Sequence, residues 1–133
     1  MTDTMSNGTD TSVAEMVDLY LAAWNETDAA ARKQLITRLW AEDGVYTDPM
    51  ASVSGIDAID GVIAGAQQQF AGMRFARGEV LEAHHNVARF TWELIPESGG
   101  EAVVVGFDVA AVDAQEKITS VYGFIDKMPG PIG

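Results

Sequence analysis

The sequence contains no cysteine, so it forms no disulfide and carries neither a thiol nucleophile nor a cysteine metal site. Basic residues are few as well: eight Lys and Arg stand against 20 Asp and Glu, and the net charge is −12. This charge argues against binding to nucleic acid or to an anionic membrane. No apolar run approaches the ~20 residues that span a bilayer, and the polar N-terminus lacks the features of a secretory signal. We therefore expect a cytoplasmic location.

The chain does have enough apolar sequence for one domain. Its 133 residues are 47% hydrophobic, which is typical of a folded globular protein. Because its ends are polar or rich in glycine and proline, we expect a disordered leader over residues 1–10 and a frayed tail over 129–133. A single domain is expected over residues 11–128.

Apolar residues recur at intervals of three and four in three segments, as they do on the buried face of a helix. This spacing predicts helices over about 12–25 and 29–40, and a third helix from Ser54 to about Phe70. The expected N-cap residues of these helices are Ser12, Asp28 and Ser54.

The segment WAEDGVYTDP, residues 40–49, lies between the second and third predicted helices. It reads as the last turn of a helix, a tight turn at Asp43-Gly44 and the start of a strand, since glycine tolerates positive φ. Alternation along that strand places Tyr46 and Asp48 on one face. A carboxylate beside an aromatic ring makes this segment the first candidate site.

The apolar period changes from three or four to two in the second half of the chain, which predicts strands. A loop is expected over residues 50–54. The expected strands are Met73–Arg77, Glu79–His84, Asn86–Pro96, Glu101–Val112 and Lys117–Asp126. Helices followed by antiparallel strands predict an α+β fold, in which three helices cover one face of a curved sheet. Such a cone has an interior where a small molecule can bind.

Asp108 is the most unusual candidate residue, because it lies in the middle of an apolar strand. Alternation places it on the same face as Val104, Gly106 and Ala110. A charge there is costly unless the carboxyl group is paired, protonated or open to water. The face is therefore either a functional pocket or a solvated or dimer-facing surface. Gly106 leaves room for a close approach.

Tyr20 lies with Trp24 on the apolar stripe of the first helix, either as a core residue or with its hydroxyl group in the cone. His84 and His85 are adjacent in a strand and point to opposite faces, so we expect no metal site. Eight aromatic residues are expected to line a substrate pocket: Trp24, Trp40, Tyr46, Phe70, Phe90, Trp92, Tyr122 and Phe124.

The segments WAEDGVYTDP, SGIDAI, RFTWEL, GFDVA and ITSVYGFID resemble the SnoaL-like branch of the nuclear transport factor 2-like superfamily. The resemblance covers about residues 12–128. It implies a cone-shaped, cystatin-like α+β roll with a mostly antiparallel sheet, commonly dimeric through the outer sheet face. The superfamily includes isomerases, cyclases, epoxide hydrolases, dehydratases and proteins that are not enzymes.

Within this superfamily, the chain resembles ketosteroid isomerase in three residues, Tyr20, Asp48 and Asp108. By that resemblance Asp48 takes a proton α to a carbonyl group, and Tyr20 and a neutral Asp108 donate hydrogen bonds to the enolate oxygen. The chain departs from the isomerase at Trp40 and Ile63, which replace supporting tyrosines.

These observations predict an enzyme that performs cofactor-free acid/base chemistry, of the isomerase or cyclase type, on a small apolar carbonyl compound. The alternative is a dimeric module that binds a hydrophobic ligand without converting it. Both hypotheses expect a small apolar molecule and a second copy of the chain as partners, and neither expects nucleic acid, a membrane, a cofactor or a metal.

Overall fold

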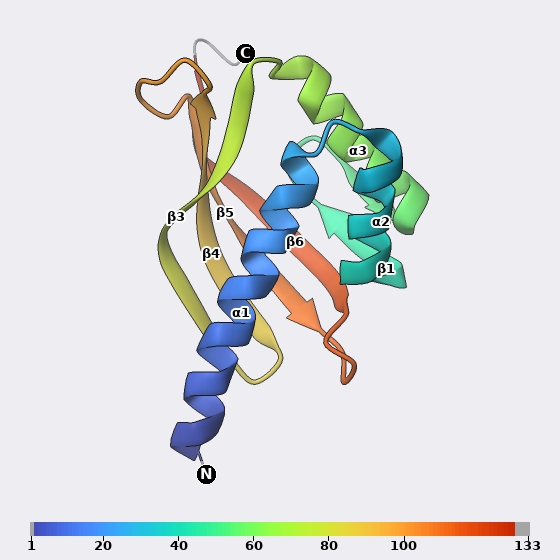
Figure 1. Cartoon of the computed structure of the whole chain (residues 1–133), viewed down its shortest axis with the longest axis vertical. Helices are drawn as coiled ribbons and strands as arrows, with labels where there is room; N and C mark the ends of the chain where they lie inside the picture. Colours follow the sequence, from blue (N-terminus) through green and yellow to red (C-terminus); the bar gives the residue numbers. More distant parts are fainter. Residues whose placement is uncertain (1, 130–133) are drawn as a thin grey trace.

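The computed structural model describes residues 2–129, with side chains from Val13 onward. Three helices precede most of a six-stranded sheet (Figure 1). The elements in chain order are α1 (Thr2–Asn25), α2 (Ala29–Leu39), β1 (Trp40–Thr47), β2 (Ser52–Ser54), α3 (Ile56–Gln69), β3 (Met73–His84), β4 (Val87–Pro96), β5 (Val104–Val112) and β6 (Ile118–Lys127).

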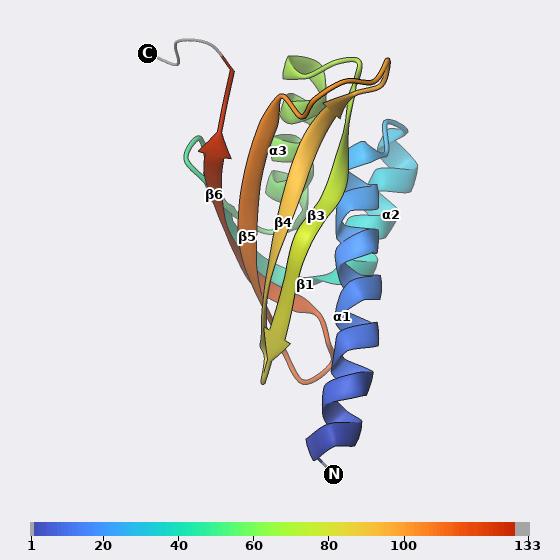
Figure 2. The same cartoon turned by 90° about the vertical axis from the view of Figure 1, so that its left-hand side faces the viewer.

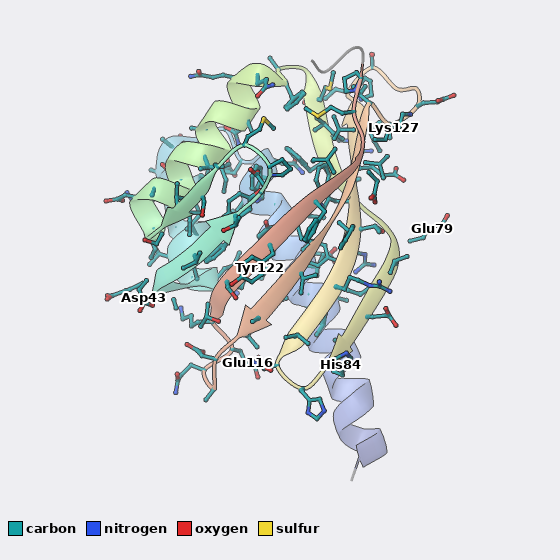
Figure 3. All side chains as sticks on the ribbon, turned by 180° about the vertical axis from the view of Figure 1, so that it is seen from behind. Asp43, Glu79, His84, Glu116, Tyr122 and Lys127 are labelled. Atoms are coloured by element: carbon teal, nitrogen blue, oxygen red, sulfur yellow. The ribbon has the colours of Figure 1, made fainter. Side chains whose placement is uncertain are left out.

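The strand order is β2-β1-β6-β5-β4-β3, so the first and last strands of the chain, β1 and β6, are neighbours inside the sheet. β1 and β6 are parallel, and the other four pairs are antiparallel. The helices lie on one face of the sheet, as Figures 1 and 2 show, and the view from behind in Figure 3 shows the strands in front of them. This arrangement confirms the predicted α+β fold class.

Helix α1 is longer at its start than the sequence predicted. It begins at Thr2 and not at Ser12, so helical backbone replaces the expected disordered leader. Extending an existing helix adds one hydrogen bond per ordered residue without a new nucleation cost, and this favours continuation into a polar segment. Met1 and, in the predicted frayed tail, residues 130–133 lie outside the described residues.

The predicted turn at Asp43-Gly44 was wrong. Helix α2 ends at Leu39, and Trp40 already belongs to β1, where it pairs with Ile118 of β6. The register of β1 shifts between Trp40 and Val45. A Cβ atom on Gly44 would lie 2.5 Å from the indole ring of Trp40, so this glycine makes room for the ring inside an irregular strand.

The predicted loop over residues 50–54 and the predicted cap at Ser54 also need correction. Residues 52–54 form β2, which pairs with β1. Gly55 N–H donates to the Gly44 carbonyl group at 2.9 Å, and this bond keeps the chain beside β1 up to that point. The N-cap of α3 is therefore Gly55, with φ of 94° and no side-chain cap.

The later strands follow the predicted alternation. Segments 73–77 and 79–84 form the single strand β3, whose register shifts between Arg77 and Leu81. β5 begins at Val104 and not at Glu101, because residues 97–103 form the connection from β4. The inward residues of β4 and β5 form part of the core between sheet and helices, and Phe90 is fully buried there.

An ion pair that the sequence did not predict joins helices α2 and α3. Arg32 of α2 is buried, and its Nε donates to Asp60 of α3 at 2.6 Å. Gln67 accepts a hydrogen bond from Arg32 and donates to the carbonyl groups of Trp24 and Glu26. The network fixes the end of α1, and with it Trp24, against α3.

Among the described helices, none combines the length and the apolar character needed to cross a membrane. The cytoplasmic location stays a prediction.

Candidate active site

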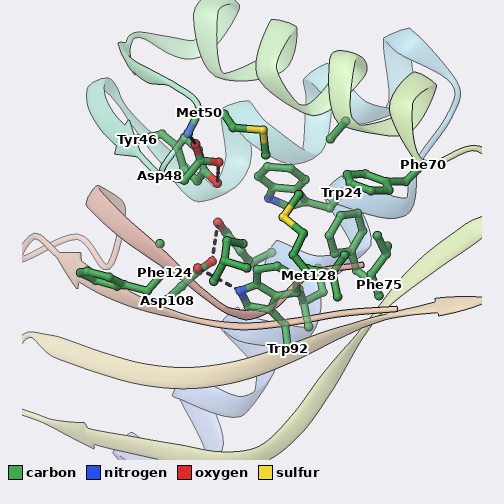
Figure 4. Close-up of a pocket in the computed structure, with 17 residues that line it drawn as sticks. Trp24, Tyr46, Asp48, Met50, Phe70, Phe75, Trp92, Asp108, Phe124 and Met128 are labelled. Carbon is green, nitrogen blue, oxygen red and sulfur yellow. Dashed lines mark hydrogen bonds between the residues drawn. The ribbon is translucent and has the colours of Figure 1, made fainter. Parts of the chain in front are cut away.

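Two tyrosine–aspartate pairs lie near the middle of the sheet, on the face that the helices cover (Figure 4). In the first, which we call the inner pair, the Tyr20 hydroxyl group donates to Asp108 Oδ2 at 3.0 Å. Trp92 Nε1–H donates to Asp108 Oδ1, also at 3.0 Å. Only 4% of Asp108 is exposed. Both oxygens of this carboxyl group are therefore held by side chains from other elements.

The second pair, which we call the rim pair, is local in sequence. The Tyr46 hydroxyl group donates to Asp48 Oδ2 at 2.7 Å. Asp48 Oδ1 accepts the backbone N–H groups of Met50 and Ala51, each at 2.8 Å. Asp48 is thus a turn-forming aspartate that connects β1 to β2, and alternation places it beside Tyr46 as predicted.

A glycine on the intervening strand lets the two carboxyl groups approach each other. β6 lies between β1 and β5, and Gly123 is the register partner of Asp108. A Cβ atom on Gly123 would lie 2.8 Å from Asp108 Oδ1 and 3.4 Å from Asp48 Cβ. Because Gly123 has no side chain, both carboxyl groups occupy the space above it.

A second glycine seats the tryptophan of the inner pair. Gly106 of β5 is the register partner of Trp92 on β4. A Cβ atom at Gly106 would lie 2.5 Å from the indole ring. The ring therefore lies directly over the glycine backbone, with Phe75 packed against it at a centroid separation of 5.7 Å. The room that Gly106 was expected to leave is filled by Trp92.

Both pairs line one small cavity with a volume of about 60 Å³ (Figure 4). Its wall is mainly apolar and comes from α1, α3, the segment after β1, and the sheet. Of the predicted pocket aromatics, those that line it are Trp24, Tyr46, Phe70, Trp92 and Phe124. The three predicted catalytic residues, Tyr20, Asp48 and Asp108, also line it, so the structure brings them together.

Three predicted pocket residues do not line this cavity. Trp40 is buried against Gly44, and Phe90 is buried behind Tyr20, with ring centroids 5.5 Å apart. Tyr122 is about half exposed on β6 and does not border the cavity (Figure 3). The apolar character of these three aromatic residues could not tell whether each lies in the core, at the cavity or on the outer surface.

Burial raises the pKa of Asp108 to about 6, although the hydrogen bonds from Trp92 and Tyr20 lower it; the charge of Asp48 raises it further. Burial also raises the pKa of Tyr20 well above its ordinary value, and the Asp108 charge adds to this effect. The pKa of Tyr46 is raised mainly by burial and then by Asp108 and Asp48. Both phenols are therefore neutral hydrogen-bond donors, whereas Asp108 can exchange a proton near neutral pH.

The SnoaL-like domain family matches residues 17–121 of this sequence. The chain belongs to the SnoaL-like family. Its fold is that of the nuclear transport factor 2-like proteins, which is also described as cystatin-like. The SnoaL-like family predicted from the sequence segments is thereby confirmed, and so is the predicted cystatin-like fold.

Three solved structures show how close the similarity is. A proposed isomerase of the SnoaL-like family from Agrobacterium tumefaciens is 37% identical, covers 87% of this chain and 98% of its own, and superposes with a TM-score of 0.83. A nuclear transport factor 2-like protein of unknown function from Exiguobacterium is 19% identical, with coverages of 84% and 98% and a TM-score of 0.66. A proposed polyketide cyclase from Sinorhizobium meliloti is 16% identical, with coverages of 86% and 97% and a TM-score of 0.63.

The last two structures are similar in fold alone. No curated protein sequence matches this SnoaL-like domain.

The two histidines of the SnoaL-like domain lie away from the cavity. Within residues 13–129, no three His, Cys, Asp or Glu side chains gather in a way that could hold a metal ion. His84 ends β3 and His85 occupies the following turn with φ of 52°, their ring centroids 5.9 Å apart. Neither histidine lines the cavity, so neither is placed to act as an acid or base there.

Several residues of this site were not predicted from the sequence. The role of Trp92 as a hydrogen-bond donor to Asp108 was not predicted. Pairing β4 with β5 would have placed Trp92 opposite Gly106, two residues from Asp108, and so would have indicated this contact. Met50 and Met128 come from segments outside regular strands, where no periodicity indicates direction. Phe75 could have been assigned from its pairing with Leu94, a buried residue of β4 that also lines the cavity.

Proposed function

We propose that this SnoaL-like domain is a cofactor-free enzyme of the isomerase or cyclase type that acts on a small apolar carbonyl compound in the 60 Å³ cavity. One observation carries the proposal: two aspartates, each hydrogen-bonded to a tyrosine, line the same apolar space. A buried carboxyl group with a raised pKa, such as that of Asp108, is a common feature of sites that perform acid/base catalysis near neutral pH. The similarity to the proposed isomerase from Agrobacterium tumefaciens supports the same class.

In this proposal the two pairs have different roles. Asp48 takes a proton from the carbon next to the carbonyl group, and in an isomerisation it returns that proton to another carbon of the conjugated system. The oxygen that becomes enolate-like accepts hydrogen bonds from Tyr20 and from neutral Asp108. No oxidant, reductant or metal is needed, because only a proton moves and the double bond shifts.

The free space limits the size of the substrate. A volume of about 60 Å³ is well below the ~300–1,000 Å³ of typical ligand pockets, so the reacting part is small. A second cavity of about 230 Å³ shares Trp24, Ala66, Phe70 and Phe75 with the first. Movement of one of these side chains would join the two spaces, and a longer molecule would then fit with its carbonyl end beside the aspartates.

The direct test is turnover of small β,γ-unsaturated ketones and short polyketide-like ketones by the wild-type protein and by Asp48→Asn. We expect Asp48→Asn to lower kcat by about 10²–10⁴-fold, since the amide cannot accept the proton. Asp43→Asn is the matched control, because Asp43 is exposed on β1 and does not line the cavity. Unchanged turnover in Asp48→Asn would contradict the proposal.

The alternative, a module that binds a hydrophobic ligand without converting it, makes the opposite prediction. Apolar ketones would bind, would be recovered unchanged, and would bind equally well to Asp48→Asn and Asp108→Asn.

We also propose that the protein acts as a cytoplasmic homodimer joined through the outer face of the sheet. Tyr122 and Phe124 are about half exposed, and Phe124 stacks on Phe107 with centroids 4.9 Å apart. Phe107 and Phe124 are register partners next to the pair Asp108 and Gly123, so alternation places their rings on the outer face, although Phe124 also borders the cavity. Exposed aromatic pairs of this kind are enriched at interfaces. Sedimentation of the purified protein at micromolar concentration checks this point, and a monomer there would contradict it.

A further inference from the structure

The hydrogen bond from Trp92 to Asp108 restricts where the carboxyl group can carry a proton. An indole N–H group can only donate, whereas a tyrosine hydroxyl group can donate or accept. Trp92 Nε1 lies 3.0 Å from Asp108 Oδ1, and the Tyr20 oxygen lies 3.0 Å from Oδ2. A proton on Oδ1 would turn this atom from a carbonyl oxygen into a hydroxyl oxygen, which is a weaker acceptor for the indole N–H group. The indole therefore favours the neutral form in which Oδ1 is the carbonyl oxygen and the proton lies on Oδ2.

We propose that Trp92 is a positioning residue that confines the proton of neutral Asp108 to Oδ2, the oxygen next to Tyr20. The proposal rests on the proposed acid/base function for its consequence, but not for its geometry. It assigns to Trp92 a task that differs from forming the cavity wall.

Trp92 is rigidly placed for this task. Its ring lies on Gly106, its register partner, with no space for a Cβ atom between them. Phe75 packs against the ring from β3. β4 and β5 pair continuously from Val87 to Leu94, so the indole cannot shift along the strand without breaking this ladder. The donor is therefore fixed relative to Asp108, two residues along β5 from Gly106.

The other charged or titratable groups around Asp108 cannot do the same. Tyr20 comes from α1, Tyr46 and Asp48 come from β1 and its end, and Gly123 is the facing residue of β6. Tyr20 and Tyr46 can each reverse their hydrogen bond, and Asp48 accepts three hydrogen bonds already. Of these neighbours, Trp92 alone is a fixed donor.

The consequence is that protonation frees one hydrogen atom for the cavity. When Asp108 is charged, the Tyr20 hydrogen atom points at Oδ2. When Oδ2 carries a proton, the two O–H groups face each other, and only one of them can donate to the other. In the free protein the second O–H hydrogen has no partner within the pair and is available to a carbonyl oxygen in the cavity. When that oxygen binds, the other O–H group can turn to it as well, which gives the two donors of the proposed function. The hydrogen bond from Trp92 to Oδ1 keeps the proton of Asp108 on Oδ2, beside the Tyr20 hydroxyl group. This is the arrangement in which an O–H group of the inner pair can donate into the cavity.

Infrared spectroscopy of the free protein tests this assignment without a substrate. An acidic-minus-alkaline difference spectrum shows the carbonyl stretch of every carboxyl group that becomes protonated. The band that is present in the wild type and absent from Asp108→Asn belongs to neutral Asp108. In the wild type this carbonyl is Oδ1 and accepts from the indole, so Trp92→Phe is expected to move the band to higher frequency. Trp40→Phe is the matched control, because Trp40 is buried but does not line the cavity, and the band should not move. An unchanged band in Trp92→Phe would overturn the proposal.

Titration gives a second readout. Losing a donor to the charged form is expected to raise the proton affinity of Asp108 by about tenfold in Trp92→Phe. In the wild type, the indole N–H resonance of Trp92 should shift with a midpoint near the Asp108 pKa of about 6, while that of Trp40 should not. This measurement needs only the folded wild type, so it remains decisive if Trp92→Phe fails to fold. A Trp92 resonance that does not follow Asp108 would overturn the proposal.

The two proposals can fail separately. If the band and the resonance behave as expected but no ketone is converted, the positioning role stands and the enzymatic function fails. If ketones are converted and Trp92→Phe changes neither the band nor the titration, the function stands and the positioning role fails.

Discussion

The inner pair and the rim pair contain the same two residue types, yet they are held in different ways. Asp108 takes its hydrogen bonds from the side chains of Tyr20 and Trp92, which belong to α1 and β4. Asp48 takes two of its three from backbone N–H groups of the next turn. A carboxyl group held by backbone groups keeps its partners whatever the surrounding side chains do. One held by distant side chains depends on the whole tertiary structure, and this makes it sensitive to substitution and to pH.

The largest expected difference between the pairs is in the pH dependence of stability. Burial raises the pKa of Asp108 to about 6, so between about pH 4 and pH 6 the folded protein binds a proton that the unfolded chain has lost. The stability contributed by neutral Asp108 is fully present below about pH 4 and is lost as the pH rises through 6. The loss amounts to roughly 3 kcal/mol.

This prediction is checked by urea denaturation of the wild type and of Asp108→Asn across pH 4–8. The difference between their free energies of unfolding isolates Asp108 from the other carboxyl groups. A difference that is flat over this range would contradict the raised pKa.

Gly123→Ala would disturb both pairs at once. The new Cβ atom would lie 2.8 Å from Asp108 Oδ1, an oxygen that the indole of Trp92 already holds, and 3.4 Å from Asp48 Cβ. We expect a loss of about 2 kcal/mol in the free energy of unfolding, as for other overpacked sites. Gly65→Ala is the control, since nothing lies within 4 Å of a Cβ atom there and alanine favours the helix. Thermal denaturation should therefore show opposite shifts for the two variants, and equal shifts would contradict this account.

Removing one tyrosine hydroxyl group at a time shows how far each pair depends on its tyrosine. Tyr20→Phe leaves the buried Asp108 Oδ2 without its donor, at a cost of about 1–3 kcal/mol, and raises the pKa of Asp108 further. Tyr46→Phe leaves Asp48 its two backbone donors, so we expect a cost of about 1 kcal/mol or less. Urea denaturation at pH 7 measures both. A larger loss for Tyr46→Phe would show that the rim pair, and not the inner pair, depends on its tyrosine.

The same contrast explains how much of the site the sequence could predict. Tyr46 and Asp48 are two residues apart in a strand, and alternation was sufficient to place them together. Tyr20 and Asp108 are 88 residues apart, and their pairing depends on how α1 crosses the sheet. The local pattern could indicate only that Asp108 was unusual, and the family resemblance supplied its partner.

The fold shows a parallel limit. Helices and long strands were predictable because each buries a periodic face, and the α+β class followed. The path around Asp43-Gly44 was not, because a glycine that makes a turn and a glycine that seats the ring of Trp40 are identical in sequence. The parallel neighbours β1 and β6 were not predictable either, since no short turn joins them.

The place of β6 between β1 and β5 also determines when the cavity can form. During synthesis, Asp48 and Asp108 both leave the ribosome before the strand that separates them. Most of the sheet lies in the sequence between Trp40 and Ile118, which pair in parallel. Contacts between residues so far apart in sequence are slow to form. Assembly of the two pairs above Gly123 is thus a late event in folding. A chain that displays the perturbed titration of Asp108 has therefore inserted its last strand.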